Sequence, residues 1–378
     1  MKFIHLSDLH LGKRLNEFSL IEDQEYILDK IIHVIDDEKP DAVIIAGDIY
    51  DKPVPPAEAV RIFDDFLCSL ALRRLQVFVI SGNHDSAERI AFGARLMDKS
   101  GIHMAPVYDG KAASVSLEDE YGIVDVYMLP FVKPAGVRRL FEDEQIDSYN
   151  DALRVCVENM NVDPSRRNVL VTHQFVTGAL RSDSEEISIG GSDNVDAAVF
   201  EAFDYTALGH IHRPQSAGAD NIRYCGTPLK YSFSECSHEK SVTVVELAAK
   251  GSVTVRTAAL VPLHDMREIK GTYMELTDRS SYAGTATDDY IHVTLTDEDD
   301  IPDAVGRLRA VYPNIMKLDY DNKRTRSSSC VEAAEAVEAK SPMELFEEFY
   351  EAQNNSSLSE EQRGFCEGII SEIWEGEI

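Results

Sequence analysis

The sequence predicts a layered α/β domain over about its first 250 residues, followed by a small α+β module and a helical tail. In the first part, short runs rich in Val, Ile and Leu alternate with longer stretches in which apolar residues recur every three to four positions. This alternation of strand and helix patterns is typical of sheets covered by helices. The strand-like runs are residues 2–6, 42–46, 77–80, 124–129, 169–172, 207–208 and 242–247.

Amphipathic helices are expected between the first three strands and after the third. Ile27, Ile31 and Ile35 repeat on one face of the first helix, and Pro40 marks its end. The second helix follows a cluster of prolines and covers about residues 57–71, and a third helical pattern covers residues 87–99.

The remainder of the chain has a different pattern. Strands are expected at residues 273–276, 291–295 and 316–318, with a helix at 301–312. Two amphipathic helical patterns close the chain, and both are too short to bury an apolar face without a partner surface. We therefore expect four parts, which are a main domain over 1–260, a small module over 261–320, a linker over 321–341 and a helical pair over 342–378.

The composition first argues against a nucleic-acid-binding protein. With 67 acidic and 37 basic residues among 378, the chain has a formal net charge of −30, whereas phosphate backbones are contacted by Lys and Arg. No apolar run is long enough to span a bilayer, the start lacks the apolar core of a signal peptide, and the six cysteines are scattered. These features predict a cytoplasmic protein with free thiols and without a membrane segment.

Five short motifs carry side chains that bind metals, and each follows a strand-like run. In an open α/β sheet, ligands gather beyond the carboxyl ends of the strands, so we expect the motifs to converge at one edge. Asp, Asn and His without Cys suit Mn²⁺, Fe²⁺ or Zn²⁺. In chain order the motifs are Asp8-Leu9-His10, Gly47-Asp48, Gly82-Asn83-His84-Asp85, Thr172-His173 and Gly209-His210-Ile211-His212.

The spacing within the motifs fits a site for two metal ions. Asp8 and His10 are two residues apart, so on an extended segment both would face the same side, and His210 and His212 repeat this arrangement. Two neighbouring cations repel each other, and a carboxylate that binds both of them reduces this repulsion. Asp48 is the candidate for the shared carboxylate. Each motif alone is more often a turn or a structural histidine. Their joint occurrence, in order and each after a strand, predicts a dinuclear site.

The ordered motifs resemble those of the calcineurin-like metallophosphoesterase superfamily. Longer stretches around them, including residues 7–12, 46–51, 207–213, 224–228 and 231–235, resemble the SbcD family, the nuclease subunits of bacterial SbcCD complexes. The resemblance covers essentially the whole chain. It implies a four-layer α-β-β-α metallophosphoesterase sandwich with a small α+β capping, DNA-binding domain and a C-terminal helical pair.

The resemblance also implies two divalent metal ions, with Mn²⁺ as the expected metal. His84 would stand over the scissile phosphate as a proton donor that binds no metal, oriented by Asp85. One ion would be held by Asp8, His10, Asp48 and His212, and the other by Asp48, Asn83, His173 and His210.

The activities that the resemblance implies are a 3′→5′ exonuclease on duplex DNA and an endonuclease on single strands and hairpins, in DNA repair and recombination. An SbcC-type ATPase would bind residues 342–378, and helices near 57–71 and 87–99 would form a homodimer. Some relatives carry a second active-site histidine where this chain has Asp51, which leaves the balance of the two activities open.

Two alternative functions stay open at the level of sequence. A small-molecule phosphodiesterase or phosphatase of the same superfamily is disfavoured by the additional module and tail, and a catalytically silent scaffold is disfavoured by the intact motifs. The acidity is also uneven, since residues 341–378 hold ten acidic residues and one Arg. We therefore expect the chain by itself to bind DNA weakly, with a shallow salt dependence.

Overall fold

The computed structural model describes residues 1–182, 184–185, 194–323, 325, 342–354 and 357–375. The chain divides into two compact units, Met1–Asp265 and Met266–Ile378. Among the described residues, no helix is both long enough and apolar enough to cross a membrane.

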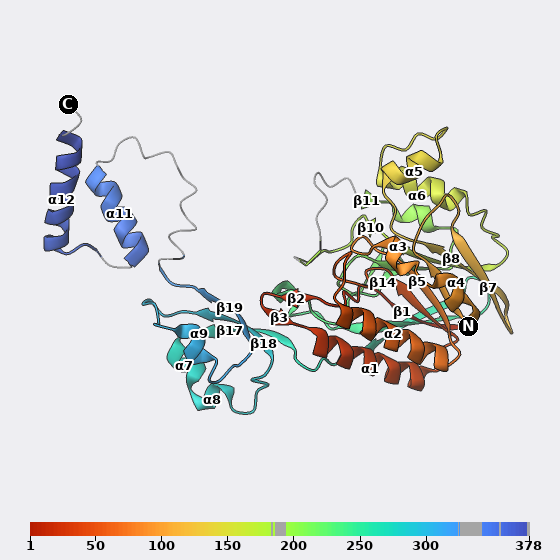
Figure 1. The fold of residues 1–378 in the computed structure, drawn as a ribbon, viewed down its shortest axis with the longest axis horizontal. Coiled ribbons are helices and arrows are strands. Elements are labelled where there is room, and N and C mark those ends of the chain that lie inside the picture. Colours follow the sequence, from red (N-terminus) through yellow and green to blue (C-terminus); the bar gives the residue numbers. More distant parts are fainter. Residues whose placement is uncertain (183, 186–193, 324, 326–341, 355–356, 376–378) are drawn as a thin grey trace. The chain divides into compact units, whose positions relative to one another are not determined.

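The first unit is built on two six-stranded sheets (Figure 1). The first sheet has the order β16 (Val253–Ala259), β15 (Ser241–Leu247), β1 (Lys2–Leu6), β4 (Ala42–Ala46), β5 (Gln76–Ile80) and β6 (Ile102–Ala105). The second has the order β13 (Gln215–Ala217), β14 (Ala219–Tyr224), β12 (Tyr205–Gly209), β9 (Arg167–His173), β8 (Gly122–Leu129) and β7 (Ala113–Asp119). From β1 to β6 in the first sheet, and from β14 to β8 in the second, neighbouring strands are parallel.

The two sheets pack face to face, and helices cover their outer faces. Phe78 of β5, Val126 of β8 and Val171 of β9 belong to one fully buried cluster between the sheets. Helices α1 (Ile21–Glu38) and α2 (Ala57–Leu72) bury one face each, and α6 (Tyr149–Glu158) packs on the second sheet. The expected four-layer α-β-β-α sandwich is therefore confirmed.

The expected continuous helix over residues 87–99 is wrong. The segment instead forms α3 (Ala87–Ile90), α4 (Ala94–Met97) and the 3₁₀ turn η1 (Asp98–Ser100). The break falls at Gly93, whose φ of 80° is incompatible with a right-handed helix and is adopted readily by glycine. The other short elements of this unit are β2 (Arg14–Leu15), β3 (Phe18–Ser19), α5 (Pro134–Leu140), β10 (Phe175–Val176), β11 (Asn194–Val195), η2 (Ala197–Phe200) and η3 (Phe233–Glu235).

The second unit contains a parallel three-stranded sheet of β17 (Met266–Gly271), β18 (Tyr290–Leu295) and β19 (Ile315–Tyr320). The strand expected at 273–276 is wrong, because those residues lie in helix α7 (Tyr273–Thr277). Thr272 and Glu275 form a capping box that starts this helix. Helices α8 (Arg279–Tyr282) and α9 (Ala304–Leu308) complete the module, and α9 is shorter than the expected helix at 301–312.

Two helices end the described chain, α11 (Pro342–Asn354) and α12 (Glu360–Glu375). The Arg363 Nε lies 3.2 Å from Glu347 Oε1 and joins the two helices, while Phe349 and Phe365 are exposed. The expected linker over 321–341 lies, apart from residues 321–323 and 325, outside the described residues.

Candidate metal centre

The candidate ligands lie where the carboxyl ends of strands from both sheets meet. Because β1, β4 and β5 are parallel, the segments that follow them bring Asp8, Asp48 and Asn83 to one edge. His173 ends β9, and His210 follows β12 directly. Buried side chains at this edge are Asp8, His10, Asp48, His173, His210 and His212.

The backbone at this edge is unusual for residues other than glycine. The φ angle is 53° at Asp8, 43° at His10, 48° at Asp48 and 105° at His210. The expectation that Asp8 and His10 lie on an extended segment is therefore wrong. Backbone hydrogen bonds from Asp8 N to Gly47 O and from His10 N to Asp48 O, both 3.0 Å, hold the segments in this shape. Such conformations concentrate at functional sites, where the surrounding structure fixes them.

One group of donor atoms is formed by Asp8, His10 and His212. Each offers a ligand atom, and these atoms all lie within 4.8 Å of one another. The Nε2 atoms of His10 and His212 are 3.1 Å apart, and the Oδ2 atom of Asp48 lies 3.8 Å from His10 Nε2.

A second group surrounds the side-chain oxygen of Asn83. Asn83 Oδ1 lies 3.0 Å from His173 Nε2 and 2.9 Å from His210 Nδ1. His173 Nε2 is also 3.3 Å from Asp48 Oδ2. The Asp48 carboxylate therefore borders both groups, which are the two sets of residues that the resemblance implies.

The distances within each group fit ligands that share an ion. Nitrogen and oxygen atoms bound at about 2.1 Å to one divalent ion lie roughly 3 Å from each other. The 3.1 Å between His10 and His212 and the 2.9 to 3.3 Å around Asn83 and His173 are close to this value. The His173 Nδ1–H donates to the Ala46 carbonyl at 2.8 Å, so its Nε2 atom is directed at the oxygens of Asn83 and Asp48. Imidazole, carboxylate and amide oxygen without thiolate suit Mn²⁺, Fe²⁺ or Zn²⁺.

The pKa shifts reflect the negative charge buried at this site. Burial holds the pKa of His10 well below its usual value and lowers the pKa of His210 to about 3, so both rings are neutral near pH 7. Burial disfavours a charged His173 as well, but the carboxylates of Asp48 and Asp8 outweigh it and raise the pKa of His173 to about 9. Burial, together with Asp48, raises the pKa of Asp8 to about 6. The buried carboxylates thus need positive charge, which divalent ions provide.

Glycine is required where the strands approach the site. A Cβ at Gly209 would collide with the Ala46 carbonyl oxygen and lie 2.6 Å from His173 Nδ1. We expect Gly209→Ala to destabilise the fold by about 3 kcal/mol or more and to lower metal content, because neither neighbour can move without displacing a ligand. Thermal unfolding and elemental analysis would measure both effects. Gly136→Ala is the matched control, since a Cβ there meets nothing within 4 Å, and equal behaviour of the two variants would contradict the prediction.

A buried polar network fixes the orientation of His212. Its Nδ1 lies 2.7 Å from Ser184 Oγ, and Ser184 Oγ in turn donates to Glu235 Oε1. The Lys240 ammonium donates to Glu235 Oε2 at 2.5 Å and to the His212 carbonyl at 2.9 Å. Burial alone would raise the pKa of Glu235, but His212 and Lys240 outweigh it and lower that pKa to about 2. The network places the His212 proton on Nδ1 and leaves the Nε2 lone pair directed at the donor group.

The sequence did not reveal this network. Ser184, Glu235 and Lys240 have no metal-motif spacing, and the contacts bridge 28 residues between Ser184 and His212 and 51 residues between Ser184 and Glu235. Glu235 lies in a stretch that resembles the family, which is the one signal that could have pointed to it.

Removing the Ser184 hydroxyl is expected to weaken metal binding. Ser184→Ala takes away the acceptor of the His212 Nδ1 proton, and loss of such a partner typically costs about 10- to 100-fold in metal affinity. Isothermal titration calorimetry of the metal-stripped protein with Mn²⁺ would measure the loss of affinity. Ser165→Ala is the control, because the Ser165 hydroxyl donates to Asp163 at the surface; an unchanged affinity in Ser184→Ala would rule out the orienting role.

His84 lies half-buried beside the two donor groups. Its backbone N–H donates to Asp48 Oδ1 at 2.9 Å, and its Nδ1 lies 3.2 Å from the Asp51 carbonyl oxygen. Its ring packs edge to face on that of His10, with centroids 4.9 Å apart. The Nδ1 contact fixes the ring and leaves Nε2 as the atom available to a substrate.

The expected orientation of His84 by Asp85 differs from the contacts observed. The Asp85 carboxylate accepts hydrogen bonds from the backbone N–H groups of Ile49, Tyr50 and Gly82, at 3.1, 3.0 and 2.9 Å. Asp85 thus ties together the segments after β4 and β5. In the described part of the chain, the hydrogen bond to the His84 imidazole comes from the Asp51 backbone instead.

Asp51, the position that differs from some relatives, is paired with Lys13. The Lys13 ammonium lies 2.7 Å from Asp51 Oδ1, and the same oxygen is 3.8 Å from His10 Nδ1. The pair places the positive charge of Lys13 beside the site. The Asp51 carboxylate thus lies on the side of His10 away from the donor group, at a distance too long for a hydrogen bond.

Known proteins are similar to this chain over its whole length. Residues 1–214 match the family model of calcineurin-like phosphoesterases, and residues 262–354 match a model described as the type 5 capsule protein repressor C-terminal domain, SbcD_C. The SbcD component of nuclease SbcCD from Staphylococcus epidermidis (strain ATCC 12228 / FDA PCI 1200) is 31% identical over 384 residues, covering 100% of both chains. The chain belongs to the SbcD family of calcineurin-like phosphoesterases. The resemblance seen in the sequence is thereby confirmed.

Solved structures also align with this SbcD family member. A dimetal phosphatase from Danio rerio covers 70% of this chain and 98% of its own length, with a TM-score of 0.40 and 10% identity. The phosphoesterase Yfce from E. coli covers 69% of this chain and 100% of its own length, with a TM-score of 0.28 and 13% identity. Family membership and the donor groups together make the chain a phosphoesterase that uses divalent metal ions.

Proposed function

We propose that this chain is the nuclease subunit of an SbcCD-type DNA repair and recombination complex, and that it hydrolyses DNA phosphodiesters with two Mn²⁺ ions. The observation that carries the proposal is the pair of donor groups bordering Asp48, in a chain that aligns over its whole length with a nuclease subunit. The proposed ligands are Asp8, His10, Asp48 and His212 for one ion, and Asp48, Asn83, His173 and His210 for the other.

The proposed chemistry divides between the ions and His84. When bound, two divalent ions polarise a phosphoryl group and lower the pKa of water, which supplies a nucleophile near neutral pH. His84 donates a proton from Nε2 to the leaving 3′ oxygen, since its Nδ1 is held by the Asp51 carbonyl. Asp85 acts through the backbone: by accepting from Ile49, Tyr50 and Gly82, it keeps the segment that carries Asn83 and His84 against the segment that follows Asp48.

The substrates proposed are duplex ends, for 3′→5′ exonuclease action, and single strands and hairpins, for endonuclease action. The decisive assay incubates the purified chain and Mn²⁺ with end-labelled duplex DNA and, in parallel, with bis-p-nitrophenyl phosphate. We expect the DNA to be shortened from its 3′ ends and the small ester to be hydrolysed. If only the small ester is hydrolysed when the ATPase partner is added to the assay, the result would favour a small-molecule phosphodiesterase instead.

The helical pair is the proposed attachment point for an SbcC-type ATPase. Phe346, Phe349, Phe365 and Ile369 are large apolar side chains that α11 and α12 leave exposed, as expected of a surface that binds a partner helix. Deleting residues 342–378 is expected to abolish capture of the ATPase subunit and to leave hydrolysis of the small ester unchanged, because every proposed ligand lies in the first unit.

Co-purification with a tagged ATPase subunit would measure the effect of that deletion. A more conservative variant, Phe349→Asp with Phe365→Asp, keeps the helices and tests the same surface. Arg154→Asp, an exposed change on α6, is the control. Retained capture in the deletion variant would place the attachment point elsewhere.

The proposed homodimer uses the region of α2, α3 and α4. Phe63, Phe66 and Leu67 of α2 are buried within the protomer, so a second copy would contact the side chains that remain outside. Phe92 and Leu96 are 85% and 77% exposed and support this surface.

Free cysteines among the described residues and a DNA substrate support a cytoplasmic location.

A further inference from the structure

A pocket of about 480 Å³ opens beside the donor group around Asn83. It is lined by the turn between β5 and α3 with the start of α3, by residues 106–108 after β6, by residues 131–133 after β8, and by one face of α5. Asn83 itself lines the pocket, while its Oδ1 atom lies within 3.0 Å of the His173 and His210 nitrogens. Any occupant of the pocket therefore adjoins the atoms proposed to hold metal.

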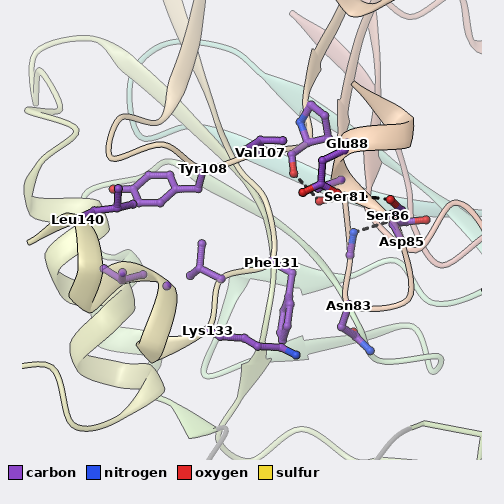
Figure 2. Close-up of a pocket in the computed structure, with 16 residues that line it drawn as sticks. Ser81, Asn83, Asp85, Ser86, Glu88, Val107, Tyr108, Phe131, Lys133 and Leu140 are labelled. Atoms are coloured by element: carbon purple, nitrogen blue, oxygen red, sulfur yellow. Dashed lines mark hydrogen bonds between the residues drawn. The ribbon is translucent and has the colours of Figure 1, made fainter. Parts of the chain in front are cut away.

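The wall next to the metal centre is aromatic and carries one positive charge. Phe131 packs edge to face on the His173 ring, with centroids 6.2 Å apart, and its backbone N–H donates to the Ser81 carbonyl, so its ring is held in place. Figure 2 shows the Lys133 side chain running along the lower edge of the Phe131 ring, on the side of the pocket where Asn83 lies. Lys133 is exposed and brings an ammonium group to the mouth.

The far wall is apolar and open to solvent. Val107 and Leu140 are 50% and 44% exposed. Leu140 and the Tyr108 ring form the end opposite Asn83, and Val107 lies between that end and Glu88 (Figure 2). Two acidic residues line the pocket. The Asp85 carboxylate is committed to three backbone N–H groups, and Glu88 accepts from Ser86 at 3.4 Å on the rim.

We propose that this pocket binds one unpaired nucleotide of the DNA strand next to the scissile phosphate, an inference that rests on the proposed nuclease function. The base would lie between Phe131 and the apolar end, and Lys133 would contact the adjoining phosphate. Aromatic and apolar surface beside a cation is the chemistry that binds single-stranded nucleic acid. A pocket of this size holds a ligand about as large as a typical drug. A single nucleotide is of that size, whereas a base pair within a duplex is too large.

The consequence is that a duplex end must open before it is cut. Unpairing costs less for a mismatched base or a base in a hairpin loop than for a matched one. The pocket would thus favour frayed ends and loops over paired DNA, without reading the sequence.

The test uses the full chain with Mn²⁺ and two oligonucleotide duplexes. Their 3′-terminal linkage is a phosphorothioate, which resists cleavage, and 2-aminopurine stands on one side of this linkage in the first duplex and on the other side in the second. Binding should change the 2-aminopurine fluorescence at one of the two positions, because the base leaves its stack. Leu140→Asp and Lys133→Ala should remove that change and raise the KM for unprotected DNA about tenfold, with kcat little altered. Both residues are exposed, so neither variant should impair folding.

Arg139→Ala is the matched control, since Arg139 lies on the same helix as Leu140 and does not line the pocket. Hydrolysis of bis-p-nitrophenyl phosphate, which is too small to reach the apolar end of the pocket, should be unchanged in Leu140→Asp and in Arg139→Ala. DNA cleavage and fluorescence in Leu140→Asp equal to those of Arg139→Ala would overturn the inference and leave the nuclease proposal standing. If the wild-type chain hydrolysed the small ester but left DNA intact even with the ATPase partner present, the nuclease proposal would be removed instead.

Discussion

Replacing Asp48 with asparagine is expected to lower phosphoester hydrolysis by about 10³-fold or more and to reduce metal content. Asp48 Oδ2 borders both donor groups, at 3.8 Å from His10 Nε2 and 3.3 Å from His173 Nε2. The amide keeps the size of the side chain but removes the negative charge that two neighbouring cations share. The kcat with saturating Mn²⁺, and elemental analysis of the purified protein, would measure the two effects.

A buried carboxylate outside the site provides the control for Asp48→Asn. Asp125 is 5% exposed and accepts from Ser116 and Arg166, so Asp125→Asn also perturbs a buried charge but leaves the donor groups untouched. We expect it to alter stability and not metal content. If Asp48→Asn kept two ions per chain and full activity, the shared role of Asp48 would have to be abandoned.

Replacing His84 with alanine is expected to lower DNA cleavage by about 10²- to 10⁴-fold, the range for loss of a general acid, while metal content stays the same. His84 reaches the donor groups through its backbone N–H, which alanine retains, so the contact to Asp48 Oδ1 is kept. The loss should be much smaller with bis-p-nitrophenyl phosphate, because nitrophenolate leaves without needing a proton. The ratio of the two losses is therefore the measurement that isolates proton donation.

Two results would separate proton donation from other roles of His84. Equal losses with DNA and with the nitrophenyl ester would mean that His84 binds the phosphoryl group and does not protonate the leaving oxygen. His103→Ala is the control, because His103 contacts Asp98 and Gln76 away from the site and should leave both activities unchanged.

The candidate site was accessible to sequence reasoning because strand ends are marked in the sequence. Parallel, fully buried strands such as β4 and β9 read as continuous apolar runs, so a ligand directly after such a run must lie at the edge of the sheet. His173 and Asp48 were found in this way. The residues that orient His212 were not found in this way. Ser184, Glu235 and Lys240 are brought together only by the tertiary fold, and no local sequence pattern predicts the buried ion pair of Glu235 and Lys240.

The differences in the fold have local physical causes. Tyr273 and Leu276 suggested a strand, but Thr272 and Glu275 cap a helix there, and this spacing of Thr and Glu was the signal that could have shown it. Gly93 interrupts the helical pattern after residue 87 by taking a left-handed backbone. The left-handed φ angles at Asp8 and His10 depend on hydrogen bonds to the segment after β4, which no reading of residues 7–12 alone could supply.

The distance along the chain between ligands has a consequence for how the protein forms. His10 and His212 are 202 residues apart in sequence and touch at Nε2, and Asn83 and His173 are 90 residues apart. Closing loops of this length is slow compared with forming local structure, so neither donor group exists until both sheets have docked. Uptake of metal should therefore accompany the last step of refolding, and the rate at which a refolding chain captures Mn²⁺ would report the docking of the two sheets.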